Sequence, residues 1–382
     1  MQLSTYVYPW DLARLGVREV FEDLNEQGVT GVDLTASYHT ITAFSPRGRG
    51  PHVFSLPRGG VCFPIRRERY GLITPADIAD AAVLRVWPEA AAQAARLGIA
   101  LSAWTVALFA PWLAQDHPAT ARVLPSGERS NVGVCPAAPA VREYLGALCA
   151  DVAEQFGLAA VKLENVAFPD FDYGWHRPRA LTTIPDRARE LLSMCFCVHC
   201  VERGRSAGIQ VDLLQVRLAA QIDAVLAGPG SRPVDDEELV AYKTLADGAV
   251  VELVSYIAES VRQEAPATRV TVAAPIEPSG SAGVDLASVI DEVGGVQLWS
   301  PRHNADAIAA LLPLLQQRPD LVVSCLHPPG FDHPVGSPTW LEELRSAIAV
   351  PVDEISLYHY GLLPRSDFDR GVRLARDLTR PA

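Results

Sequence analysis

The feature that most constrains this fold is a repeated alternation of short apolar segments with longer segments of helical periodicity. Eight segments are rich in β-branched and aromatic residues, as strands are: Ser4–Pro9, Gly31–Ala36, Ile99–Phe109, Ala159–Val166, Arg269–Ile276, Val296–Ser300, Leu321–His327 and Glu354–Tyr360. Such alternation is typical of a parallel sheet built from βα units. Eight units predict an α/β fold of the (β/α)8 TIM-barrel type, because eight parallel strands close without leaving an edge.

An open, doubly wound sheet is the alternative architecture. No G-x-G-x-x-G follows the first strand and no phosphate-binding loop motif occurs, so dinucleotide and nucleotide binding lose their main support. Long loops follow the second, third and fourth strands, at about residues 37–74, 110–134 and 167–266. Because active sites of such barrels lie at the carboxyl ends of the strands, we expect residues 1–382 to form one barrel domain with an elaborated active face.

The charge balance of the chain limits its partners. The net charge is −12, which argues against a nucleic-acid or anionic-membrane surface. No apolar run reaches the roughly 18 residues that a membrane span needs, and the N-terminus lacks the pattern of a signal peptide. We therefore expect a cytoplasmic protein without nucleic-acid or membrane partners. The sequence leaves the oligomeric state open, a homo-oligomer included.

Four cysteines have the spacing of a metal site. Cys195, Cys197 and Cys200 form a C-x-C-x-x-C motif, and Cys135 lies upstream of it. Thiolates at such short spacing can converge on one ion, and four of them leave no open position for chemistry. The motif predicts a structural Zn²⁺ site, in which His199 could replace one sulfur. The alternative is four unrelated buried thiols.

Carboxylates with inward strand parity are the candidate catalytic groups. Side chains alternate along a strand, so Val161 and Leu163 facing the helices would leave Glu164 inside the barrel. Glu164 is the first candidate, because a charged residue at the end of an apolar strand is costly without a purpose or a partner. Glu277 and Asp33 compete for the role of second carboxylate. Two carboxyl groups across a cleft can cleave a glycosidic bond, with retention at a separation of about 5 Å and inversion at about 6.5–9.5 Å.

The same parity predicts a polar and aromatic lining around these carboxylates. Aromatic faces pack against the apolar faces of sugar rings, and carboxylates and amides bind the hydroxyls. The predicted substrate-binding residues are Tyr6, Tyr8, His39, Trp104, Lys162, Asn165, Trp299 and Tyr358. The candidate residues also have structural alternatives. Glu164 could pair with Lys162 or an arginine, Glu277 could be a solvated loop residue, and Asp33 could be a hydrogen-bond hub. Trp104, Trp299 and Tyr358 could be core aromatics, and His39 could be a structural histidine.

At the cysteine motifs the chain resembles the catalytic barrel of family 42 β-galactosidases. The resemblance rests on Cys135-Pro136 followed by Pro139 and Arg142, then a helix, a fourth strand and the Cys195–Cys200 motif. It is specific over roughly residues 130–205. It implies a structural zinc and a retaining glycosidase, with a general acid/base at the end of strand four and a nucleophile at the end of strand seven.

Two departures from that family separate this chain from a typical member. The family has Asn-Glu at strand four, whereas this chain has Glu164-Asn165. Strand seven ends in His327 without a glutamate, so the nucleophile is not carried over. The leading hypothesis is a divergent glycoside hydrolase that uses paired carboxylates.

Two other functions stay open at the sequence level. A carbohydrate-binding pseudo-enzyme would have kept the barrel and lost the nucleophile. A sugar lyase or epimerase would use Lys162, His39 or Tyr358 as acid/base groups.

Overall fold

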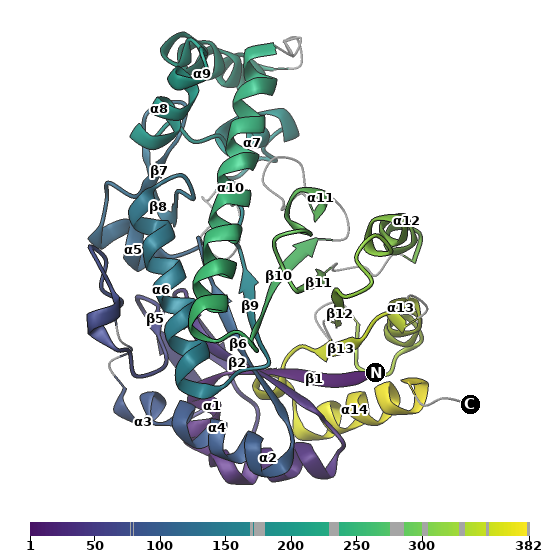
Figure 1. The fold of residues 1–382 in the computed structure, drawn as a ribbon. Helices are drawn as coiled ribbons and strands as arrows, with labels where there is room; N and C mark the ends of the chain where they lie inside the picture. The colour runs from purple at the N-terminus through teal and green to yellow at the C-terminus, as the bar shows by residue number, and fades with distance from the viewer. Residues whose placement is uncertain are drawn as a thin grey trace.

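The computed structural model describes residues 1–76, 78, 80–168, 171, 180–228, 237–275, 286–299, 305–327, 333–348 and 351–379. Eight of its strands run parallel around a closed ring: β1 (Gln2–Val7), β2 (Gly31–Tyr38), β6 (Ala100–Val106), β9 (Ala160–Glu164), β10 (Arg269–Pro275), β11 (Gly295–Trp299), β12 (Val322–His327) and β13 (Glu354–Leu357). Their order is β1-β13-β12-β11-β10-β9-β6-β2, and pairing of β2 with β1 closes the ring (Figure 1). The predicted (β/α)8 barrel is confirmed.

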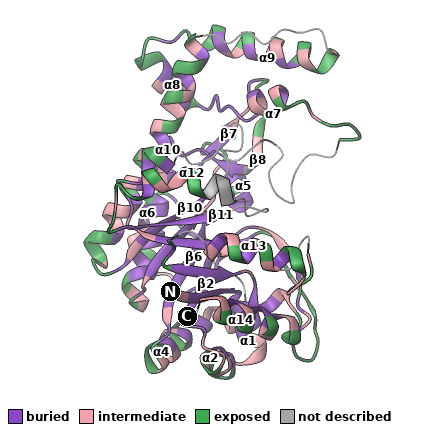
Figure 2. Ribbon diagram, turned by 90° about the vertical axis from the view of Figure 1, so that its right-hand side faces the viewer, coloured by how far each residue is buried: buried purple, intermediate pink, exposed green. Residues whose placement is uncertain are grey.

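Helices surround this ring and bury one face against it. The larger ones are α4 (Val86–Leu97), α6 (Pro139–Phe156), α10 (Glu237–Glu264), α12 (Ala305–Leu315), α13 (Pro338–Ile348) and α14 (Arg365–Thr379). Figure 2 shows that the strands at the centre are buried, whereas the helices carry both buried residues and exposed ones. Within the described ranges, no helix is long and apolar enough to span a membrane.

The first and last elements differ in extent from their predictions. The sequence predicts one helix from Asp11 to Gly28, but the chain forms α1 (Pro9–Leu15) and α2 (Val17–Glu26). Gly16 separates them at a φ of 90°, a conformation that favours glycine. The last strand ends at Leu357 rather than Tyr360, because a short 3-10 turn, η3 (Tyr360–Leu362), follows it.

The three long loops after strands contain secondary structure of their own. The first holds the hairpin β3 (Ile41–Phe44)–β4 (Val53–Leu56) and β5 (Gly60–Val61), which pairs antiparallel with β2. The second holds α5 (Pro111–Asp116), β7 (Ala121–Val123) and β8 (Arg129–Val134). The third holds α7 (Asp186–Leu192), α8 (Val198–Ser206), α9 (Val211–Ala227) and α10. In Figure 1, α8, α9 and the upper end of α10 form an arm that extends away from the barrel.

A buried charged layer crosses the barrel interior. The Lys162 ammonium on β9 lies 2.8 Å from Asp33 Oδ2 on β2 and 2.7 Å from Glu354 Oε1 on β13. Ser356 Oγ lies 3.1 Å from the same Glu354 oxygen and 2.7 Å from Ser4 Oγ. Strands that are distant in sequence therefore meet through one lysine, which fixes their mutual register.

Two carboxylates share this single cation, and their pKa values differ as a result. Burial raises the pKa of Asp33 to about 6 despite the neighbouring Lys162. Burial would also raise the pKa of Glu354, but the Lys162 charge and hydrogen bonds from Lys162, Ser4 and Ser356 together hold that pKa below its usual range. The Glu354–Lys162 pair is thus the firmer of the two ion pairs.

Replacing the shared lysine should destabilise the fold strongly. Lys162→Met removes the cation and leaves two buried carboxylates without it, and breaking a buried pair in this way costs about 3–5 kcal/mol. We expect that loss in the free energy of unfolding, measured by guanidinium denaturation near neutral pH.

Lys243→Met is the matched control. Lys243 is part-exposed and pairs with Glu190 on the arm side of the molecule. Partly exposed pairs contribute about 1 kcal/mol or less, so this variant should lose little stability. Equal losses in the two variants would contradict a central role for the Lys162 layer.

Candidate functional site

Glu164 lies at the carboxyl end of β9, two residues beyond Lys162 on the same side of the strand. Its Oε2 accepts a hydrogen bond from Trp104 Nε1 at 2.6 Å, and its Oε1 accepts one from Asn165 Nδ2 at 3.1 Å. Desolvation raises the pKa of Glu164 to about 6, although the Trp104 hydrogen bond lowers it. A half-buried carboxyl group with this pKa can carry a proton to a substrate near neutral pH.

Aromatic rings from three strands surround Glu164. Tyr6 contacts Trp104 edge-on at a centroid distance of 4.7 Å. Three phenols form a hydrogen-bonded cluster, since Tyr8 Oη lies 3.0 Å from Tyr38 Oη and 3.3 Å from Tyr358 Oη. Tyr8 and Tyr38 are buried, whereas Tyr358 is half-exposed. Glu164 and Tyr358 are therefore the more accessible polar groups of this aromatic mouth.

The other predicted residues divide between the mouth and the layer below it. Asp33 and Lys162 belong to the buried charged layer, with exposed fractions of 1% and 3%. This placement favours a structural role for both. Asp33 accepts hydrogen bonds from Ser4, Lys162 and Ser356, in line with the hub alternative, whereas Lys162 pairs with Asp33 and Glu354 rather than with Glu164. His39 is buried and stacks on Tyr38 at 4.2 Å, and its Nδ1 lies 2.6 Å from the Thr40 carbonyl oxygen.

Asn165 follows the candidate carboxylate in an uncommon backbone conformation. Its φ of 54° makes it the one non-glycine residue with positive φ among those described. The turn directs the Asn165 amide back to Glu164, which gives the carboxylate a second donor beside Trp104. Glu164 and its neighbour Asn165 are therefore linked by a side-chain hydrogen bond at this strand end.

The second carboxylate is not identified by the described residues. Glu277 lies outside them, as does the side chain of Trp299, whose backbone ends β11. His327 ends β12 fully buried against Trp340, with ring centroids 4.9 Å apart. At the described carboxyl ends of the eight barrel strands, Glu164 is the one carboxylate.

Sequence analysis missed several residues that complete this site. Glu354 shares the inward parity of Ser356, so the alternation rule could have found it at the start of the last strand. Tyr38 was missed because the predicted second strand ended at Ala36, two residues too early. Gln297 of β11 was missed as well; its Oε1 accepts from Tyr6 Oη, and its Nε2 lies 3.3 Å from Ser356 Oγ. Gln297 thus links the mouth to the charged layer.

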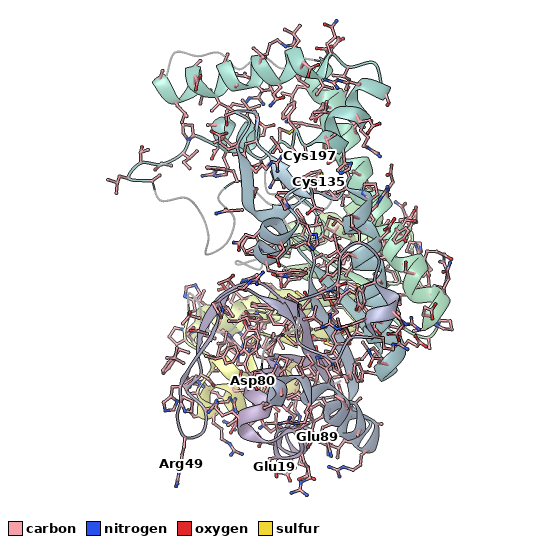
Figure 3. All side chains as sticks on the ribbon, turned by 90° about the vertical axis from the view of Figure 1, so that its left-hand side faces the viewer. Glu19, Arg49, Asp80, Glu89, Cys135 and Cys197 are labelled. Atoms are coloured by element: carbon pink, nitrogen blue, oxygen red, sulfur yellow. The ribbon has the colours of Figure 1, made fainter. Side chains whose placement is uncertain are left out.

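The four predicted metal ligands converge. The sulfurs of Cys135, Cys195, Cys197 and Cys200 lie within 4.8 Å of one another, and all four residues are buried. Sulfurs bound tetrahedrally to one zinc ion stand about 3.8 Å apart, so this spacing fits a four-thiolate metal site. Figure 3 shows Cys135 and Cys197 close together above the barrel. The cluster can hold a metal ion.

Backbone hydrogen bonds connect this cluster to the candidate carboxylate. Val134, which precedes Cys135, donates to the Leu108 carbonyl at 3.1 Å. Leu108 in turn donates to the Asn165 carbonyl at 2.9 Å, and Ala107 donates to the Glu164 carbonyl at 2.8 Å. The cysteine cluster therefore supports the same strand end that carries Glu164.

Two β-galactosidases are among the solved structures that share this architecture. A β-galactosidase from the haloarchaeon Halorubrum lacusprofundi superposes with a TM-score of 0.61 at 14% identity, covering 99% of this chain and 58% of its own. A catalytic mutant of Gan42B, a family 42 β-galactosidase from G. stearothermophilus, gives 0.58 at 14% identity, covering 98% and 56%. The fold is shared with family 42 barrels. This chain spans less than three fifths of the length of these two enzymes.

A third similar structure matches over nearly its whole length. The glycoside hydrolase domain of PgaB (BpsB) from Bordetella bronchiseptica superposes with a TM-score of 0.61 at 13% identity, covering 99% of this chain and 98% of that domain. No family model matches the sequence, and no curated protein does. At such low identities the likeness establishes the fold alone, so the resemblance to family 42 is confirmed at that level.

Proposed function

We propose that this protein is a divergent glycoside hydrolase that acts on a carbohydrate or glycoside substrate, with Glu164 as a catalytic carboxyl group. The observation that carries the proposal is the position of Glu164: a half-buried carboxyl group at a barrel-strand end, hydrogen-bonded to Trp104 and surrounded by tyrosines. Aromatic enclosure excludes water, and the barrel is of a kind found in glycosidases.

Glu164 would act as the general acid. Its protonated form would donate to the leaving oxygen, and the resulting carboxylate would be stabilised by the Trp104 N–H. Tyr358 would bind a sugar hydroxyl from the half-exposed side of the mouth. Glu277 is the proposed second carboxylate, because Asp33 is held in the Lys162 ion pair.

We further propose that the cysteine cluster binds a structural Zn²⁺. Four thiolate donors in a buried, closed set favour zinc and leave no coordination position for substrate. The ion would supply no chemistry to the reaction. Its effect would be to tie the loop after β6, through Cys135, to the segment that follows β9.

A carbohydrate-binding pseudo-enzyme is the second candidate. The observation that favours it is the end of β12, where the resemblance implies a nucleophile and the chain has the fully buried His327. A lyase or epimerase has less support, because Lys162, one of its candidate acid/base groups, is bound to two carboxylates.

Removing the Glu164 carboxyl group should reduce turnover strongly while preserving the fold. In a screen of aryl glycosides and oligosaccharides, we expect Glu164→Gln to lower kcat/KM by about 10²–10⁴-fold, the usual contribution of a general acid. Glu143→Gln, on the exposed face of α6, is the matched control and should match the wild type. Binding without hydrolysis by the wild type would favour the pseudo-enzyme, and product masses without added water would favour a lyase.

The pH profile should show the ionisation of Glu164. A general acid works in its protonated form, so kcat/KM should fall as the pH rises through about 6. Trp104→Phe removes a donor that favours the charged form, so this limb should move to higher pH. A limb that instead falls on acidification through the same range would assign Glu164 as a base or nucleophile.

Loss of a cluster cysteine should remove the metal and lower thermal stability together. Cys195→Ser should lose bound zinc, measured by elemental analysis, and should melt at lower temperature than the wild type because metal binding contributes to folding. Cys149→Ser, a buried cysteine of α6 outside the cluster, should keep its zinc. Wild-type protein without metal after chelator-free purification would contradict the zinc proposal.

A further inference from the structure

A continuous stack of aromatic rings runs from the β3–β4 hairpin to Glu164. Phe54 of β4 stacks on Trp10 at a centroid distance of 4.4 Å and an interplanar angle of 5°. Trp10 stacks on Tyr8 at 4.3 Å and 19°, and Tyr8 stacks on Trp104 at 5.6 Å and 23°. The stack ends at the hydrogen bond from Trp104 Nε1 to Glu164 Oε2.

Tyr8 is the ring that covers a face of Trp104. Three tyrosine rings meet this indole edge-on or nearly so, Tyr6 at 85°, Tyr38 at 74° and Tyr358 at 79°. The His359 ring is tilted by 56° at a centroid distance of 6.1 Å. Edge contacts limit sliding of the indole, whereas a stacked ring fixes the tilt of its plane. That tilt sets the direction of the N–H bond, and hydrogen bonds weaken steeply as this direction departs from the acceptor.

Packing rather than hydrogen bonding fixes the middle of the stack. Trp10 is 5% exposed, and its indole nitrogen has no hydrogen-bond partner among the described residues. The place of Trp10 therefore depends on the rings on its two sides, Tyr8 and Phe54. Removing the outer ring would leave one face of Trp10 without its packing partner.

The hairpin that supplies the outer ring is anchored to the barrel. Arg47, between β3 and β4, donates from Nε to the Tyr360 carbonyl, and its guanidinium lies 3.8 Å from the Tyr360 ring centroid and 4.8 Å from that of Phe368. Arg14 Nη2 donates to Ser45 Oγ at 2.7 Å. These contacts hold the hairpin, and Phe54 with it, against the mouth.

We propose that Phe54 is a positioning residue that fixes the Trp104 indole against the Glu164 carboxylate through the Trp10–Tyr8 stack. A hairpin outside the barrel thereby controls the charge state of the group inside it. The catalytic meaning of this control rests on the proposed function, but the physical link does not.

The ionisable groups around Glu164 make its pKa a direct readout of this link. Four phenols have pKa values that are raised in part by the Glu164 charge: Tyr6 of β1, Tyr8 just after β1, Tyr38 of β2 and Tyr358 just after β13. These phenols stay neutral near pH 6, as does His359, because burial holds its pKa well below the usual range, and Lys162 below stays charged between its carboxylates. Asp33 also has a pKa of about 6, but it lies in the Lys162 layer, and the shift at Glu164 is caused by desolvation and the Trp104 hydrogen bond rather than by the Asp33 charge. A change in the Glu164 pKa near pH 6 therefore reports on desolvation and on the Trp104 hydrogen bond.

The experiment compares two phenylalanines of the same hairpin. Carboxyl carbon NMR of Glu-labelled protein, with the Glu164 signal assigned from Glu164→Gln, gives the pKa without any substrate. We expect Phe54→Ala to raise this pKa by a measurable fraction of the rise caused by Trp104→Phe. Phe44→Ala is the matched control, because Phe44 is 61% exposed and, paired with Val53, lies on the hairpin face opposite to Phe54; it should leave the pKa unchanged.

Coupling through Trp104 gives a second criterion. In a protein that already carries Trp104→Phe, Phe54→Ala should cause no further rise of the pKa, because the hydrogen bond it acts on is gone. Equal pKa values in the Phe54→Ala and Phe44→Ala variants would overturn the proposal.

If Phe54→Ala does not fold, Phe54→Leu keeps most of the side-chain volume without the flat ring, and its Glu164 pKa is compared with that of Phe44→Ala in the same way. If the Glu164 pKa changes among the variants as expected but the wild type hydrolyses no glycoside, the proposed function is overturned and the link from Phe54 to Glu164 stands.

Discussion

The buried ion pairs of Lys162 are the interaction on which the rest of the structure depends. One ammonium group and two carboxylates meet inside a closed barrel, where an unpaired charge would be strongly unfavourable. The pairing holds β2, β9 and β13 at one relative height. Glu164 stands two residues beyond Lys162 on β9, so the height of the candidate catalytic group is set by the same interaction.

As a consequence, the buried ion pairs and the more solvent-accessible Glu164 lie at different levels along the barrel axis. The lower layer holds a cation with two carboxylates and is closed to solvent, while the upper layer holds Glu164 among uncharged rings. Tyr6 and Gln297 join the two layers by hydrogen bonds, so the rings of the mouth rest on a polar floor. Because no cation pairs with Glu164 among the described residues, desolvation dominates its pKa and keeps it near 6.

The sequence periodicity predicted the barrel strands well, because each strand can be recognised from the residues of one short segment. Alternation along Ala160–Glu164 was enough to place both Lys162 and Glu164 inside the barrel, and the short cysteine spacing was enough to group four thiols. Partners across the barrel were beyond that reasoning: Glu354 meets Lys162 only because the ring closes. The stack from Phe54 was equally hidden, since it needs a loop hairpin to fold back over the strand ends.

Several independent supports converge on one carboxyl group. Backbone hydrogen bonds from the cysteine loop hold the strand end, Trp104 and Asn165 donate to the two oxygens, and stacked rings hold Trp104. None of these is needed to close a barrel, and a neutral side chain at position 164 would avoid the desolvation that raises the pKa of Glu164. A carboxyl group surrounded in this way, at the end of the barrel where barrel enzymes bind substrate, is what the proposed use of Glu164 requires and what stability alone would not favour.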